Sequence, residues 1–237
     1  MRRRRKSLDY RERAIVYETR RVKLNPFFSP LNSSAWCGKM ATVPAVYDKY
    51  ARFYDRAFAP LERIGLDRWR QEVLNLLPRD STILEIGCGA GANFKYYPRS
   101  KLAVSSEVSL KMLEVAAGKR RENCLIQVDA QSLPFGKNEF DAAFATLVFC
   151  SIPDPSLAFC ELKRVLKPGG LIVLLEHVRP DGFLGPIFDV LDRVTVAMAD
   201  DHFNRETVEI AESAGLEIIE VRKKMASIVN LIVCKAV

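Results

Sequence analysis

The chain lacks any hydrophobic run long enough to cross a membrane. Apolar residues make up 49% of the 237 positions, but no run of them approaches the roughly 18 consecutive positions that a spanning helix needs. The six cysteines include no Cys-x-x-Cys pair, which argues against both a disulfide framework and a zinc site. We therefore predict a cytoplasmic protein with reduced thiols and no bound metal.

Net charge is also lacking, except at the N-terminus. Residues 24–237 carry 26 basic and 26 acidic side chains, whereas residues 1–23 carry ten basic and three acidic ones. We predict a basic, flexible leader at 1–42 and one domain at 43–237. The leader would be solvated, or would hold the protein peripherally on an anionic membrane. Residues 1–39 could also be a transit peptide, or extra residues ahead of a translation start at Met40.

Short apolar runs alternate with helical patterns along the rest of the chain. Strands are predicted at 82–86, 102–106, 125–129, 140–146, 171–176, 217–223 and 227–235. Helices are predicted at 46–58 and 61–77 with Pro60 as the break, and at 109–120, 155–166 and 206–214, with a turn at 167–170. This alternation predicts an α/β protein with a doubly wound, mostly parallel sheet. No helix separates the last two strands, so one of them should run antiparallel.

A glycine-rich turn with an acidic residue before it follows the first predicted strand. Glu85 closes that strand, and Gly87, Cys88, Gly89 and Gly91 follow it. Glycines at such a position allow a tight turn and let backbone N–H groups approach a ligand closely. The spacing alone therefore predicts a nucleotide-like ligand at this turn.

Acidic residues also end the next two strands. Glu107, which precedes Val108, lies 20 residues after Gly87, where a carboxylate reaches the hydroxyl groups of an adenosine ribose. Asp129 and Ala130 follow the third strand, where a carboxylate can accept a hydrogen bond from an adenine amino group. These residues complete the predicted cofactor site.

The carboxylate of Glu85 discriminates between cofactors. A dinucleotide would place its pyrophosphate at this turn, where a carboxylate would repel it. S-adenosyl-L-methionine (SAM) has no phosphate and carries a positive sulfonium and a positive amino group, which Glu85 can stabilise directly or through water. The pattern thus favours SAM, with S-adenosyl-L-homocysteine as the product, over a nicotinamide cofactor.

Four segments of the chain resemble the successive motifs of class I SAM-dependent methyltransferases that have a type 11 domain. They are Leu84–Gly91, Asp129–Phe135, Phe140-Asp141 and Leu166–Gly170. The resemblance covers roughly residues 46–235. It implies a Rossmann-like sheet of seven strands with a reversed C-terminal hairpin.

The closest branch resembles the quinone-biosynthesis and phospholipid methyltransferases, and especially the animal methyltransferase-like thiol methyltransferases. Gly91–Pro98, Thr146–Ser151 and Glu176–Val178 carry this similarity. Two departures stand out. The animal proteins begin with an apolar membrane anchor where this chain has a basic leader, and Glu107 stands where Asp is usual.

Residues beyond the fourth and fifth strands should border the transferred methyl group. Thr146 and Leu147 are predicted to contact the cofactor, and Ser151 to contact the cofactor or substrate or to cap the next helix. His177 is a candidate general base, with an unperturbed pKa near 6.5, or a structural histidine. His202 resembles part of a substrate-entrance loop, and a surface turn is the alternative.

Three tyrosines share one face of the first predicted helix. Tyr47, Tyr50 and Tyr54 are spaced i, i+3 and i+7, within lid helices predicted at 43–78. This face would close over the sulfonium through cation–π contacts, or it would face the core. The apolar insertion at 183–203 would roof a substrate pocket, touch a membrane or form a core helix.

These features predict a methyltransferase that acts by direct displacement on an oxygen, nitrogen or sulfur nucleophile. The acceptor would be a small or lipophilic molecule such as a thiol, a quinol or an amino lipid. The alternatives are a silent SAM-binding module and a nicotinamide-dependent oxidoreductase. Nucleic acid is not an expected substrate, because the domain is neutral and Thr146–Phe149 replaces the Asn-Pro-Pro-aromatic type of motif.

Overall fold

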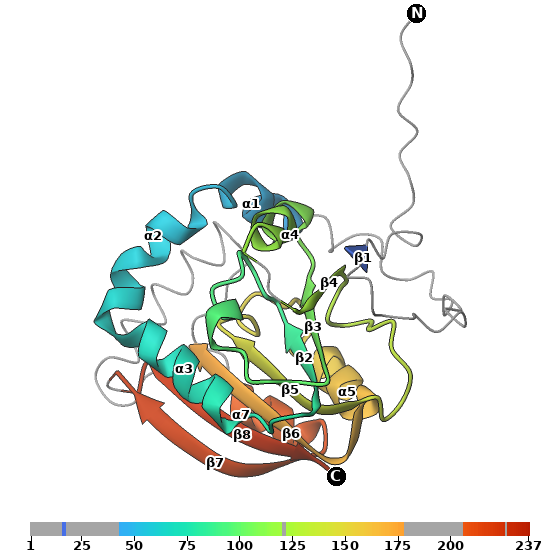
Figure 1. Cartoon of the computed structure of the whole chain (residues 1–237). Helices are drawn as coiled ribbons and strands as arrows, with labels where there is room; N and C mark the ends of the chain where they lie inside the picture. The colour runs from blue at the N-terminus through green and yellow to red at the C-terminus, as the bar shows by residue number, and fades with distance from the viewer. Residues whose placement is uncertain (1–15, 18–42, 120–121, 178–205, 226) are drawn as a thin grey trace, which may run out of the picture.

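An eight-stranded sheet forms the centre of the protein (Figure 1). The structure is a computed structural model, and it describes residues 16–17, 43–119, 122–177, 206–225 and 227–237. The strands are β1 (Val16–Tyr17), β2 (Thr82–Ile86), β3 (Leu102–Glu107), β4 (Cys124–Gln127), β5 (Phe140–Thr146), β6 (Leu166–His177), β7 (Leu216–Lys224) and β8 (Val229–Ala236). Their order across the sheet is β1-β4-β3-β2-β5-β6-β8-β7.

The five strands from β4 to β6 are parallel to one another. Strand β8 lies between β6 and β7 and is antiparallel to both, so the doubly wound sheet with a reversed C-terminal hairpin is confirmed. The seven predicted strands are all present. The eighth, β1, consists of two residues of the predicted leader and pairs antiparallel with β4.

The amino-terminal helices differ from the two that the sequence predicts. They are α1 (Val43–Tyr50), α2 (Tyr54–Leu61), a π-helical turn η2 (Glu62–Leu66) and α3 (Asp67–Leu76). The prediction that Pro60 separates two helices is wrong, because Pro60 lies inside the last turn of α2. The interruptions fall instead at residues 51–53 and at Gly65, whose φ of 152° is non-helical.

The later α-helices, α4 (Leu110–Ala117), α5 (Pro155–Val165) and α7 (Thr207–Ser213), follow the predictions closely. A 3₁₀ turn, η3 (Phe94–Tyr96), was not predicted. Ser109 caps α4 as predicted, since its hydroxyl accepts from the backbone N–H of Met112. The predicted turn at 167–170 is a bulge within β6, where the pairing with β5 jumps from Phe140–Leu166 to Ala142–Leu171.

Two apolar layers cover the central strands. On one face α5 packs Phe159 and Leu162 against the sheet. On the other face α3 packs Trp69 and Val73 against strands that include Val173 of β6. Because parallel strands end at the same edge, the residues after β2, β3, β4 and β5 meet there. Within the described ranges, no helix is long and apolar enough to cross a membrane.

At the opposite edge, Asp141 ties the start of β5 to the start of β2. Its Oδ2 accepts from the backbone N–H of Thr82 at 2.8 Å and from the Thr82 hydroxyl at 2.7 Å, and its Oδ1 accepts from Lys167 at 2.6 Å. The Lys167 hydrogen bond and the two from Thr82 lower the pKa of Asp141 from an ordinary 3.8 to about 2.

We predict that Asp141→Asn lowers the free energy of unfolding by about 1 kcal/mol at neutral pH, a value discounted because the carboxylate is 33% exposed. Since the folded pKa lies below the unfolded one, this stabilisation is complete above about pH 4 and disappears as the pH falls through 2. Denaturant unfolding of both proteins across this range measures it. Asp80→Asn, which removes the exposed pair with Arg99, is the control, and equal losses in the two variants would contradict the assignment.

Candidate cofactor-binding site

A cleft opens at the carboxyl edge of the parallel strands, between the glycine-rich turn and the helices α1 to α3. It brings together most of the residues that the sequence predicts for the cofactor and substrate. The predicted residues that line it are Tyr47, Tyr54, Gly87, Cys88, Gly89, Glu107, Val108, Asp129, Ala130, Thr146, Leu147 and Ser151.

Glu85 lies beneath this cleft, not in its wall. Its carboxylate is fully buried at the end of β2. Oε1 accepts from the Asn93 amide at 2.7 Å, and Oε2 accepts from the Tyr97 hydroxyl at 2.5 Å. Burial raises the pKa of Glu85, while these hydrogen bonds and the charge of Arg70 oppose the rise. Because Asn93 and Tyr97 donate to the two carboxylate oxygens, this geometry does not favour a direct contact between Glu85 and a cofactor sulfonium.

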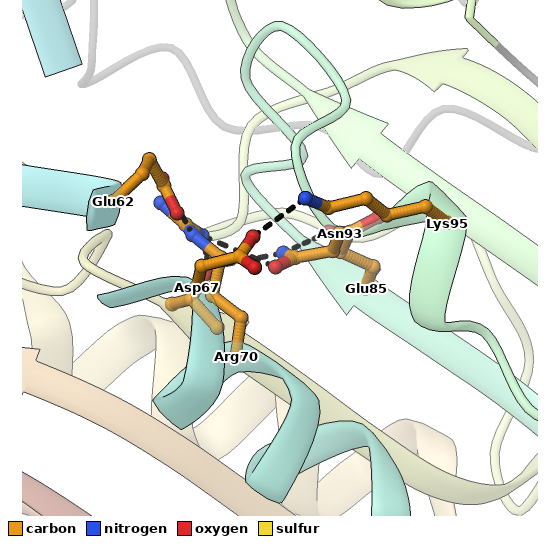
Figure 2. Close-up of polar contacts among 7 residues, drawn as sticks. Glu62, Asp67, Arg70, Glu85, Asn93 and Lys95 are labelled. Atoms are coloured by element: carbon orange, nitrogen blue, oxygen red, sulfur yellow. Dashed lines mark hydrogen bonds and ion pairs between the residues drawn. The ribbon is translucent and has the colours of Figure 1, made fainter. Parts of the chain in front are cut away.

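Arg70 supplies the positive charge of the same network. It comes from α3, is 5% exposed and lines the cleft. Its guanidinium donates to Asn93 Oδ1 at 3.1 Å, to Thr146 Oγ1 at 2.5 Å and to Glu62 at 3.0 Å. Figure 2 shows the chain of contacts that runs from Glu62 through Arg70 and Asn93 to Glu85. One buried cation thus joins α3, the glycine-rich loop and the end of β5.

Glu107 stands in the wall of the cleft, where the sequence predicts the contact with ribose. Its Oε2 accepts from the Gly89 N–H at 2.8 Å and its Oε1 accepts from the Ser109 N–H at 2.9 Å. Burial raises the pKa of Glu107, and the nearby charge of Glu85 adds to the rise. The carboxylate therefore locks the end of β3 to the glycine turn and presents its charge to the cleft.

Asp129 reaches the cleft from the loop after β4. Its Oδ1 accepts from the backbone N–H of Gln131 at 2.9 Å, and both carboxylate oxygens accept from the Gln131 side-chain amide. The side-chain oxygen of Gln131 in turn accepts from the N–H of Asp154, the N-cap of α5. Asp154, rather than Ser151, caps that helix. The Ser151 hydroxyl donates instead to the Val148 carbonyl at 3.0 Å.

The loop after β5 is held in a strained conformation. Leu147 has a φ of 58°, in the left-handed region that costs a non-glycine residue about 1–2 kcal/mol. Its N–H donates to the Leu175 carbonyl at 2.7 Å. The N–H groups of Val148 and Phe149 donate to the fully buried carboxylate of Glu176. Glu176, which begins the similar segment Glu176–Val178, thus fixes this wall of the cleft.

Residues 43–68, called the lid below, border the cleft through α1 and α2. Tyr47 and Tyr54 line the cleft, with ring centroids 6.5 Å apart. Asp48 fixes α1 to the start of α4, because its Oδ1 accepts from the Ser109 hydroxyl at 2.5 Å and from the Lys111 N–H at 3.2 Å. The carboxylate also lies at the positive end of the α4 dipole.

Three further predicted site residues, Tyr50, Gly91 and His177, do not line the cleft. Tyr50 is 52% exposed and does not share the face of Tyr47 and Tyr54, because the chain leaves the helix between residues 50 and 54. Gly91 lies against the Phe94 ring and does not line the cleft. His177 ends β6 and does not line the cleft, and the neighbouring Glu176 is buried behind the wall. His202 and the insertion at 183–203 lie outside the described residues.

The sequence did not single out Arg70, Asn93 and Tyr97. Asn93 and Tyr97 lie in the Gly91–Pro98 segment, and the polar residues that interrupt its aromatic pattern were the available signal. Arg70 lies in an ordinary amphipathic helix and carries no such signal. In the described part of the chain, no cluster of His, Cys, Asp or Glu could hold a metal ion.

Comparison with known proteins agrees with this geometry. Residues 84–174 match the family model Methyltransf_11, a methyltransferase domain. The chain is 32% identical over 149 residues to thiol S-methyltransferase TMT1B of Rattus norvegicus, which covers 59% of this chain and 61% of that protein. It is 30% identical over 155 residues to demethylmenaquinone methyltransferase of Tropheryma whipplei, which covers 62% and 64%. The chain thus spans about three-fifths of the length of these curated relatives.

Solved structures show the same fold. A SAM-dependent methyltransferase of Thermotoga maritima, described as a possible histamine N-methyltransferase, superposes with a TM-score of 0.66 at 22% identity, over 82% of this chain and all of that one. Residues 84–174 therefore resemble a methyltransferase domain, on the fold that SAM-dependent methyltransferases adopt. The predicted resemblance to these enzymes and the predicted fold are confirmed.

We predict that Gly87→Ala weakens SAM binding by at least about tenfold. Gly87 has a φ of 63°, and a Cβ there would lie 2.6 Å from the Val148 side chain, so the turn or the β5 loop must move. Gly169→Ala is the matched control, because Gly169 has a φ of 76° but nothing within 4 Å of its added Cβ. Calorimetric titration with SAM compares the two variants, and equal affinities would show that the turn does not shape the site.

Proposed function

We propose that the protein is a SAM-dependent methyltransferase that transfers the methyl group to the sulfur of a small or lipophilic thiol. The observation that carries the proposal is the meeting of the glycine turn, Glu107 and Asp129 in one cleft. The similarity to thiol S-methyltransferase TMT1B supports the choice of acceptor.

The residues of the cleft fit the chemistry of SAM. The carboxylate of Glu107 would accept from the ribose hydroxyls and that of Asp129 from the adenine amino group. The rings of Tyr47 and Tyr54 would face the sulfonium by cation–π contact. When bound, SAM supplies a methyl group on a positive sulfur, ready for displacement. The protein's own task is to align the two reactants and to exclude water.

A thiol suits a cleft whose charged side chains already have partners. Glu107 accepts from two backbone N–H groups, Asp129 accepts from Gln131, and Arg70 donates to three side chains. A thiol has a pKa near 8.5, against about 10 for a phenol and about 10.4 for an alkyl ammonium group. It is the acceptor class that reaches the reactive, ionised state most readily without a proton acceptor from the protein.

A quinol is the second candidate acceptor, supported by the similarity to demethylmenaquinone methyltransferase at almost the same identity. A screen of thiols, quinols, amino lipids and small amines with labelled SAM separates these classes. Binding of SAM without transfer to any of them would leave a silent SAM-binding module.

We predict that the pH profile of methyl transfer follows the acceptor. With an aliphatic thiol and a more acidic aromatic thiol, the rate should rise with pH and level off near each thiol's own pKa, because the thiolate is the nucleophile. Initial rates at saturating SAM, measured as a function of pH, give the midpoint for each thiol. The Glu107→Ala variant is expected to lose cofactor binding. A shared midpoint for the two thiols would contradict this account and indicate a base on the protein.

A further inference from the structure

The helices that cover the cleft have a strongly asymmetric distribution of charge. Residues 48–68 contain four acidic side chains, and each contacts the body of the domain or the base of the lid. The contacts are Asp48 with Ser109, Asp55 with Lys119, Glu62 with Arg70, and Asp67 with Lys95. Figure 2 shows two of them, Glu62 with Arg70 and Asp67 with Lys95.

The same segment contains five basic residues, all of them exposed: Lys49, Arg52, Arg56, Arg63 and Arg68. None of them forms an ion pair with any residue in the described ranges. Because three of the four acids are paired with cations outside this segment, the segment keeps more unpaired basic than acidic side chains, although residues 24–237 as a whole are neutral.

Large apolar side chains are interleaved with these arginines. Phe53 is 61% exposed, Ile64 67%, Tyr50 52% and Leu61 41%. Four of the eight large hydrophobic residues that are exposed in the described part of the chain therefore lie within 15 consecutive positions. Helices α1 and α2 form an outer edge of the molecule, away from the sheet (Figure 1).

We propose that this outer lid surface, formed by the four arginines and the four apolar side chains, docks on an anionic lipid bilayer. Exposed aromatic and aliphatic residues bury into the boundary between headgroups and acyl chains, while neighbouring arginines bind the anionic headgroups. A protein partner would also accept apolar side chains, but an excess of unpaired cations among exposed apolar side chains complements an anionic membrane surface best.

Docking in this manner would set the cofactor cleft close to the bilayer. Tyr47 and Tyr54, on the inner side of the same helices, line the cleft, so only the thickness of the lid separates the lipid surface from the reacting groups. A lipophilic acceptor would then reach the cleft from the membrane. The docking itself does not depend on which acceptor the enzyme uses.

Vesicle co-sedimentation of the full chain tests the proposal. The protein should bind vesicles of phosphatidylcholine with phosphatidylserine and bind pure phosphatidylcholine much more weakly. Replacing Arg52, Arg56 and Arg63 together by Gln should reduce binding by about 100-fold, since each cation near the surface contributes about fivefold. Phe53→Ser with Ile64→Ser should remove the part of the binding that resists high salt.

A matched control carries the same charge change elsewhere. Arg79, Arg99 and Lys101 are exposed at the amino ends of β2 and β3, the edge of the sheet opposite the cleft. Their triple replacement by Gln should leave vesicle binding within about twofold of the original. Every variant keeps residues 1–42, so binding by the basic leader is common to all. Equal losses in the lid and control variants, or binding unaffected by the lid variants, would overturn the proposal.

Discussion

A carboxylate buried without access to water constrains the whole cofactor end of this domain. Glu85 is fully buried, and an unpaired charge there would cost several kcal/mol. Asn93 and Tyr97 satisfy its oxygens, and Arg70 supplies the opposing charge through Asn93. Because Arg70, in α3, also donates to Thr146, one network joins α3, the glycine-rich loop and the end of β5. The cleft takes its shape from this arrangement.

The rest of the site is built in layers on that network. Glu107 holds the glycine turn from the side, Glu176 holds the β5 loop, and Asp48 holds the lid on α4. Each acidic group therefore acts on backbone N–H groups or on a neighbouring element, and two of them, Glu107 and Asp129, also face the cleft. Three acids of the lid likewise pair with cations outside it, which leaves the basic side chains of the lid without partners among these acids.

Much of this was predictable from the sequence because it follows from local patterns. Apolar runs alternating with helices gave the strands, and Gly87, Glu107 and Asp129 follow strand ends that must meet at one edge of a parallel sheet. The features that local patterns did not predict have a different origin. The inward or outward position of Glu85 and His177 depends on packing, and Arg70 meets Thr146 across 76 residues. The helix was expected to break at Pro60, but α2 accommodates this proline in its last turn. The break falls instead after Tyr50, and it turns the Tyr50 ring away from the cleft.

A double-mutant cycle on Glu85 and Arg70 tests the central role of the buried network most directly. Glu85→Gln removes the negative charge, Arg70→Met removes the positive charge, and the double variant removes both. Denaturant unfolding measures the stability of each variant, and titration with SAM measures its affinity. If the two charges stabilise one another, each single variant leaves a buried charge uncompensated, and the double variant loses about 1–3 kcal/mol less than the sum of the two single losses. Additive losses, with SAM affinity unchanged in both single variants, would contradict the account.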